Sequence, residues 1–136
     1  MWHTIIIAGN VGRDPEMRYT PSGQAVTSFS VATDDSYKAS DGERVKRTIW
    51  FRISAWGKLA ETCSQYLHKG SKVLVEGRLQ ANESGNPKTF QRSDGSTSAS
   101  FEVIANTVRF LSSKGEGPGS GEEVGGTAES SEEIPF

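Results

Sequence analysis

The sequence predicts a small all-β domain with one helix, followed by a disordered acidic tail. Three observations support this. Five segments have the residue types of β-strands, one segment between the third and fourth has helical periodicity, and the composition changes abruptly after Leu111. With 136 residues the chain has room for one domain.

The predicted strands are short and rich in β-branched and aromatic residues. The first is an isoleucine-rich apolar run, and the second alternates Phe29 and Val31 with small polar residues. A shorter extended piece, MRYT, lies between them among Pro and Gly residues. The five strands are expected at residues 3–10, 25–33, 48–56, 71–80 and 99–111.

The predicted helix spans residues 58–69. Its apolar residues recur at positions i, i+1, i+4, i+7 and i+8, which places them on one helical face. They are Leu59, Ala60, Cys63, Tyr66 and Leu67. Gly70 then stands where a helix-terminating C′ glycine is expected. Three strands, a helix and two strands is the chain order of an OB-fold, a five-stranded Greek-key barrel.

Two polar segments connect the strands. Residues 34–47 contain a turn signal at Asp41–Gly42. Residues 81–98 form a long polar piece in which Asp94–Gly95 suggests a hairpin tip.

The final 25 residues, 112–136, have the composition of a disordered segment. Gly, Ser and Pro make up 13 of them, and the segment carries six Glu and one Lys. It has too few apolar residues to offset its ordering entropy. Residues 1–111, by contrast, carry 14 basic and 11 acidic side chains, so we expect a mildly basic domain with an acidic tail.

Several protein classes are disfavoured. One Cys and two His cannot form an internal disulfide or a closed Cys/His zinc site. No run of 18 apolar residues is present, and the N-terminal residues lack the features of a signal peptide. We therefore expect a cytoplasmic protein without metal or cofactor.

The most informative segment is the strand at residues 48–56. Because side chains alternate along a strand, Ile49, Phe51, Ile53 and Ala55 share a core face. Trp50, Arg52, Ser54 and Trp56 share the opposite face. Two indoles flanking an arginine are suited to stack nucleobases and contact phosphate. The alternative is that both indoles pack under a loop or at a subunit interface.

Basic and aromatic residues surround this strand in the sequence. Lys38, Arg44, Lys46 and Arg47 precede it, and Lys58 follows it. Residues 81–98 add Lys88, Phe90 and Arg92. Such interleaving is typical of a groove for single-stranded nucleic acid.

Signals for catalysis are weak. Cys63 lies on the apolar helix face, as a small buried residue would, and neither His3 nor His68 has an evident partner. Carboxylates in the 34–47 loop could form a catalytic or metal-binding pair, but nothing fixes their positions. Gly9 and Gly12 match only a bare GxxG, and the phosphate-binding P-loop pattern is absent.

The sequence resembles the bacterial single-stranded DNA-binding proteins over nearly its whole length. The resemblance rests on residues 6–16 (IIAGNVGRDPE), 29–33 (FSVAT), 50–52 (WFR), 57–61 (GKLAE), 66–70 (YLHKG) and 75–79 (VEGRL). Arg18, Tyr19, Gly23 and the ending Glu132-Glu133-Ile134-Pro135-Phe136 add to it.

This resemblance implies an OB-fold that assembles as a homotetramer and binds single-stranded DNA without strong sequence preference. It implies roles in replication, recombination and repair, and recruitment of genome-maintenance proteins through the tip Glu132, Glu133, Ile134, Pro135 and Phe136. The base-stacking positions correspond to Trp50, Trp56, Phe90 and Tyr37. The expected phosphate contacts are Arg18, Arg52, Lys58, Lys69, Lys72, Lys88 and Arg92.

Two other classes remain open on the residues alone. An OB-fold could serve as a protein-docking subunit with its tryptophans at an interface. A small nuclease could use the carboxylates of residues 34–47.

Overall fold

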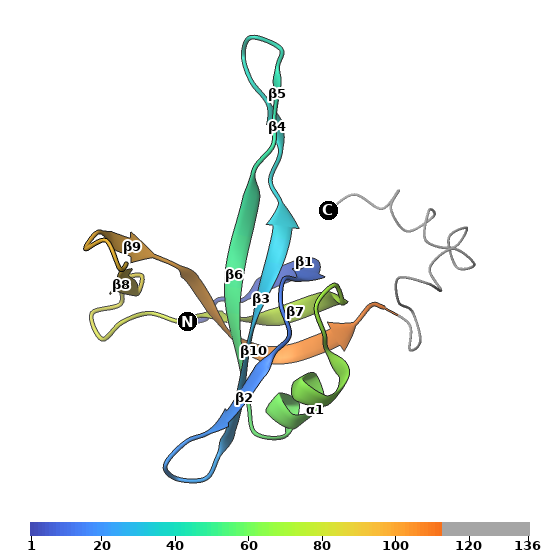
Figure 1. Ribbon diagram of the computed structural model, residues 1–136, viewed down its shortest axis with the longest axis vertical. Coiled ribbons are helices and arrows are strands. Elements are labelled where there is room, and N and C mark those ends of the chain that lie inside the picture. Colours follow the sequence, from blue (N-terminus) through green and yellow to red (C-terminus); the bar gives the residue numbers. More distant parts are fainter. Residues whose placement is uncertain (113–136) are drawn as a thin grey trace.

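The computed structural model describes residues 1–112 and shows a closed five-stranded barrel (Figure 1). The barrel strands are β1 (Ile5–Val11), β3 (Ala25–Asp34), β6 (Thr48–Trp56), β7 (Lys72–Leu79) and β10 (Phe101–Phe110). They pair in the order β1-β7-β10-β6-β3, and a β1–β3 pairing closes the ring. The β6–β10 pair is parallel and the others are antiparallel. This is the predicted OB-fold.

Several smaller elements lie outside the five-stranded barrel. The strand β2 (Glu16–Tyr19) pairs with β3, and two hairpins project outward, as Figure 1 shows. One extends the β3–β6 ribbon and the other precedes β10. Their strands are β4 (Tyr37–Lys38) with β5 (Arg44–Val45), and β8 (Thr89–Gln91) with β9 (Thr97–Ala99). The hairpin turns contain Gly42 and Gly95 at φ of 89° and 90°, so both predicted turns are confirmed.

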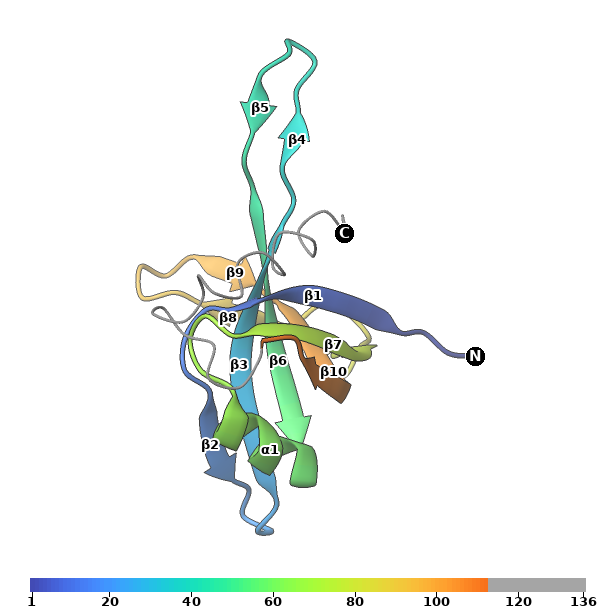
Figure 2. The ribbon, with the colours of Figure 1, turned by 90° about the vertical axis from the view of Figure 1, so that its right-hand side faces the viewer.

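The core lies inside the barrel and is covered at one end by helix α1 (Lys58–Tyr66) (Figure 2). Alternate residues of each strand point inward, and Val31, Ile53, Val73, Val75 and Val103 are fully buried. From α1, Ala60 and Cys63 are buried with them. The buried Thr27 hydroxyl donates to the Ala60 carbonyl at 2.7 Å and ties β3 to the helix.

The helix ends earlier than the sequence pattern predicts. Leu67 is already extended, with φ −93° and ψ 147°, although its N–H still donates to the Cys63 carbonyl. Gly70, at φ 94°, therefore serves the turn into β7 rather than the helix terminus. Its N–H donates to the Val11 carbonyl at 2.8 Å. The apolar pattern continues through Leu67 because that residue packs in the core without being helical.

Two glycines allow strands to approach closely. A Cβ on Gly9 would lie 2.2 Å from the Ala32 carbonyl oxygen, where β1 meets β3. A Cβ on Gly77 would lie 2.1 Å from the Ile104 oxygen, beside the register shift in β10 between Ala105 and Thr107. Both contacts are with backbone, which cannot move aside as a side chain can.

Within residues 1–112, no helix has the length and apolar character needed to cross a membrane. The same part of the chain contains no group of three or more His, Cys, Asp or Glu placed to hold a metal ion.

We predict that Gly9→Ala destabilises the domain, because its methyl group would overlap backbone where the barrel closes. Overpacking of this kind costs about 1–3 kcal/mol. Urea unfolding followed by circular dichroism measures the loss, with Ala8→Ser on the outward side of the same strand as a control. Equal stability of Gly9→Ala and wild type would contradict the close approach of β1 and β3.

Candidate nucleic-acid interface

Strand β6 has the two faces that its sequence predicts. Ile53 and Ala55 are buried in the core, with Phe51 packed partly against it. On the opposite face, Trp50 and Trp56 are 52% and 40% exposed. We call Trp50, Arg52, Ser54 and Trp56 the β6 outer face. Its two indoles stand six residues apart, which is about 20 Å along a strand.

The neighbouring strand β3 leaves this face uncovered. Antiparallel register places Ala32 beside Trp50, Ser30 beside Arg52 and Ser28 beside Ser54. Residues directly opposite each other in a sheet point to the same side. Because the β3 residues are small, the larger β6 side chains rise above them and remain accessible.

Gly12, just after β1, provides the space that Trp50 occupies. A Cβ at Gly12 would lie 2.4 Å from Cζ3 of the Trp50 ring. The indole therefore rests on bare backbone. In the sequence Gly12 belongs only to a weak GxxG pattern, and nothing local indicated that it supports a tryptophan.

Three of the predicted contact residues converge on one open groove of about 370 Å³. Arg52 comes from β6, while Lys88 and Phe90 come from the start of the β8–β9 hairpin. We call this the Arg52 groove, and its lining is completed by Ser28, Ser54, Gln80, Thr89 and Glu102. It places an aromatic ring, two cations and several hydrogen-bonding groups together.

Trp56 borders a second depression, the Trp56 groove, where it lies with Arg78. The rest of the lining is Gln24, Leu59, Ile104, Ala105 and Asn106. Sequence reasoning missed Arg78 as a candidate contact. Alternation along β7 places it outward, but its proximity to Trp56 depends on how β7, β10 and β6 are aligned.

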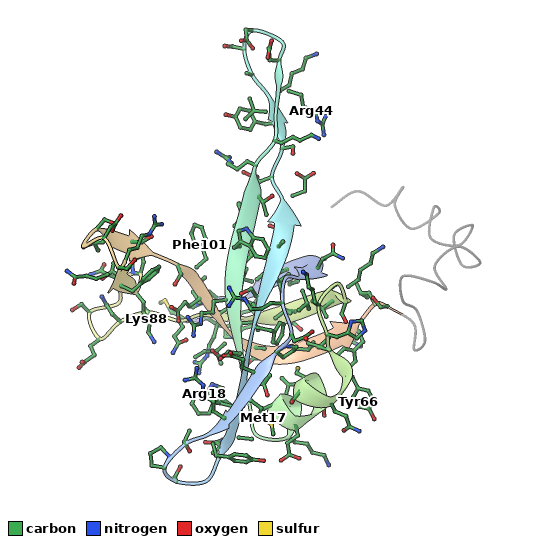
Figure 3. All side chains as sticks on the ribbon, in the orientation of Figure 1. Met17, Arg18, Arg44, Tyr66, Lys88 and Phe101 are labelled. Carbon is green, nitrogen blue, oxygen red and sulfur yellow. The ribbon has the colours of Figure 1, made fainter. Side chains whose placement is uncertain are left out.

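Arg18 lies on the same side of the sheet as Trp56. Register places Arg18 beside Val26 and Val26 beside Trp56 across three strands. Figure 3 shows Arg18 and Lys88 on the same side of the barrel. Arg18 approaches Glu16 at 3.6 Å, and both side chains are exposed, so this ion pair holds Arg18 only weakly.

Tyr37 stands apart on the β4–β5 hairpin. The Arg47 guanidinium lies over its ring, 5.1 Å from the centroid. Arg47 is itself held by Asp35, to whose Oδ2 its Nε donates at 2.7 Å. One ring face is therefore covered, while Tyr37 as a whole remains 46% exposed.

The remaining predicted cations are spread around the barrel. Lys58 begins α1 directly after Trp56 and Gly57. Lys72 on β7 lies in the same cross-strand row as Trp50 on β6. The row runs from Lys72 through Asn10 on β1 and Ala32 on β3 to Trp50. Lys69 is exposed in the preceding turn, where its backbone N–H donates to Asp14. The Arg92 side chain instead donates to Ser98 Oγ at 2.9 Å across the β8–β9 hairpin.

The other reactive groups are engaged locally. Burial raises the pKa of the Cys63 thiol to about 11, so it is a poor nucleophile. His3 Nε2 accepts the Leu79 N–H at 3.0 Å. Hydrogen bonds from Ser36 lower the pKa of Asp34, and Asp41 accepts the Glu43 N–H. The carboxylates of the 34–47 segment thus cap turns and bind Arg47 rather than forming a shared site. Residues 132–136 lie outside the described part of the chain.

Comparisons with known proteins bear on the family and the fold. A model of the Single-strand binding protein family matches residues 2–111. The single-stranded DNA-binding protein of Neisseria meningitidis serogroup A is 41% identical over 115 residues, covering 85% of this chain and 63% of that protein. Single-stranded DNA-binding protein 1 of Chlorobaculum tepidum is 43% identical over 115 residues, covering 85% and 68%. The match thus spans roughly two thirds of these relatives' length.

Two solved structures share the fold. An SSB from Plasmodium falciparum in complex with single-stranded DNA superposes with a TM-score of 0.66 at 24% identity, covering 82% of this chain and 96% of that one. A deletion mutant of the Thermus aquaticus single-stranded DNA-binding protein gives 0.63 at 24% identity, covering 83% and 52%. With the family match over residues 2–111, the chain belongs to the single-strand binding protein family.

Proposed function

We propose that the protein binds and protects single-stranded DNA, largely without sequence preference, by stacking bases on exposed aromatic rings. The observation that carries this proposal is the β6 outer face, where Trp50, Arg52 and Trp56 stand exposed opposite a complete core. Stacking on an aromatic side chain contributes about 1–3 kcal/mol per base and does not require a particular base. Family membership and relatives named as single-stranded DNA-binding proteins support it.

In this proposal, phosphate contacts contribute less to affinity than base stacking does. Residues 1–111 carry only three more basic than acidic side chains. Among the described residues, however, the only ion pairs are Arg18–Glu16 and Arg47–Asp35, so most cations are available to phosphate. Arg52, Lys88 and Arg78 line the two grooves. The logarithm of affinity should fall with that of salt concentration by about 0.7 per phosphate contacted.

The proposal includes a cellular setting. A non-enzymatic protein that covers single strands would act in replication, recombination and repair in the cytoplasm. Its tip, residues 132–136, would recruit other genome-maintenance proteins, because a Phe beside acidic residues suits an apolar pocket with basic groups around it.

Assembly as a homotetramer is also proposed, and β1 supplies a surface for one of its contacts. Residues 5–10 of β1 pair with β7 on one side, whereas only Asn10 and Val11 pair with β3 on the other. This leaves an open strand edge, which can pair with a second chain. Beside it, Ile6 is 62% exposed on the outer face.

We predict that Trp50→Ala weakens binding of an oligo-dT about 5- to 150-fold, the equivalent of one lost stacking contact. Titrations monitored by fluorescence anisotropy of a labelled oligonucleotide measure the loss. Trp2→Ala is a matched control, because Trp2 is 83% exposed but lies before β1 and outside both grooves.

Circular dichroism should show that Trp50→Ala keeps its fold, since the side chain lies outside the core. Unchanged affinity, or unfolding of the variant, would reject stacking on Trp50. Wild-type intrinsic fluorescence that does not respond to oligonucleotide would instead favour a protein-docking function.

We predict that removing residues 113–136 leaves single-stranded DNA affinity unchanged or slightly higher and abolishes partner recruitment. The deletion begins after Ser112 because its Oγ accepts the Lys72 N–H at 2.8 Å. The six negative charges of the tail no longer compete with DNA for basic residues. Anisotropy and pull-down with full-length protein alongside measure both effects, and normal recruitment by the truncated protein would exclude the tip as the partner site.

We predict that Ile6→Glu shifts the protein to smaller assemblies, because it introduces charge beside the open β1 edge. Sedimentation velocity at several concentrations measures the change. Glu61→Gln, on an exposed position of α1, is the control. If the wild type is a monomer, the proposed assembly is wrong. If it assembles but Ile6→Glu leaves the assembly unchanged, the contact does not involve the β1 edge.

A further inference from the structure

The Arg52 groove contains more than the groups needed to bind a uniform sugar-phosphate chain. Besides Arg52 and Lys88 it is lined by Glu102, Gln80 and the aromatic residue Phe90. Carboxylates repel phosphate, so a groove that served only electrostatic attraction would gain by lacking one.

Glu102 is held in this position by two strands. It is the register partner of Arg52 across the parallel β6–β10 pair, so both side chains point to the outer face. Its carbonyl accepts the Gln80 N–H at 2.8 Å, which places Gln80 directly beside it. The Ser100 hydroxyl donates to Glu102 Oε2 at 2.8 Å and orients the carboxylate.

In the described part of the chain, the Glu102 carboxylate forms no ion pair with the neighbouring cations. In residues 1–112, ion pairs form only at Arg18–Glu16 and Arg47–Asp35. Neither Arg52 nor Lys88 therefore approaches Glu102 within 4.0 Å, although all three line the same groove. Oε2 receives the Ser100 hydroxyl, and within residues 1–112 no other side-chain hydrogen bond or ion pair engages this carboxylate.

An ionised carboxylate accepts hydrogen bonds and cannot donate them. Cytosine presents an amino group at C4, which donates to Glu or Asp, whereas thymine and uracil present an oxygen acceptor there. Phe90 lines the same groove as Glu102 and Gln80, so a base stacked on its ring would lie in the groove that these two polar residues also line. Gln80 both donates and accepts, so it tolerates either base.

We propose that Glu102 reads the edge of the base stacked on Phe90 and favours cytosine over thymine or uracil at that nucleotide. Arg52 and Lys88 hold the flanking phosphates. The remaining stacking positions stay indifferent to sequence. The inference rests on the proposed binding of single-stranded DNA and adds a local base preference to it.

The test compares oligodeoxycytidine with oligodeoxyuridine, each about ten nucleotides long to fit one OB domain. Uridine is used because it lacks the thymine methyl group, which would add an apolar contact of its own. The measured quantity is the ratio of the two dissociation constants, determined at one salt concentration for wild type, Glu102→Gln, Glu102→Asp and Glu61→Gln.

We expect the preference for cytidine over uridine to fall about tenfold in Glu102→Gln. A hydrogen bond to a charged group changes affinity by about tenfold or more, and the new amide can also donate to uracil. Glu102→Asp keeps the charge but shortens the reach, so its ratio should fall as well. Glu61→Gln, on the exposed surface of α1, should retain the wild-type ratio.

If Glu102 affected binding only through its negative charge, the two oligonucleotides would respond alike. If Glu102→Gln tightens binding of both oligonucleotides equally and the ratio stays at its wild-type value, base reading by Glu102 is rejected while single-stranded DNA binding stands. If wild type binds neither oligonucleotide, the proposed function fails, and this inference fails with it. Circular dichroism of both Glu102 variants verifies that each is folded.

Discussion

The pairing of β1 with β3 is the contact on which the rest of the structure depends. Only Asn10 and Val11 of β1 pair with β3, yet this short junction converts a curved sheet into a barrel. Gly9 permits the close approach, and Gly12, three residues later, leaves the space in which Trp50 rests. One segment thus closes the core and supports an indole of the candidate interface.

Alternation along the barrel strands also separates the buried core from the candidate interface. Alternation along β6 directs Ile53 and Ala55 into the core and Trp50, Arg52 and Trp56 outward. The core is completed by α1 and the other strands without any contribution from the outward residues. Exposed indoles are an unfavourable use of apolar surface unless a ligand covers them, and their β3 register partners, Ala32 beside Trp50 and Val26 beside Trp56, leave both exposed.

Local pattern was enough to predict most of the fold, because strand alternation and helical periodicity are properties of neighbouring residues. It also identified both β6 faces correctly. It failed where the outcome depends on distant segments. Leu67 continues the helical pattern because the core accepts it in an extended conformation. Gly12, Arg78 and Glu102 have no local signal, since their places in the site arise from the β1–β3 junction and the parallel β6–β10 register.

The small excess of basic residues constrains how such a surface can bind nucleic acid. A site dominated by phosphate contacts would lose affinity steeply with salt, and a carboxylate among its cations would repel the phosphates. Here Glu102 lies in the same groove as Arg52 and Lys88 and is held by Ser100 rather than neutralised by them. That arrangement favours our proposal that stacking on Trp50, Trp56 and Phe90 supplies most of the affinity, because the energy of a stacked base does not depend on net charge. A surface that binds mainly through rings can therefore accommodate one acceptor that distinguishes bases, while the other positions remain indifferent to sequence.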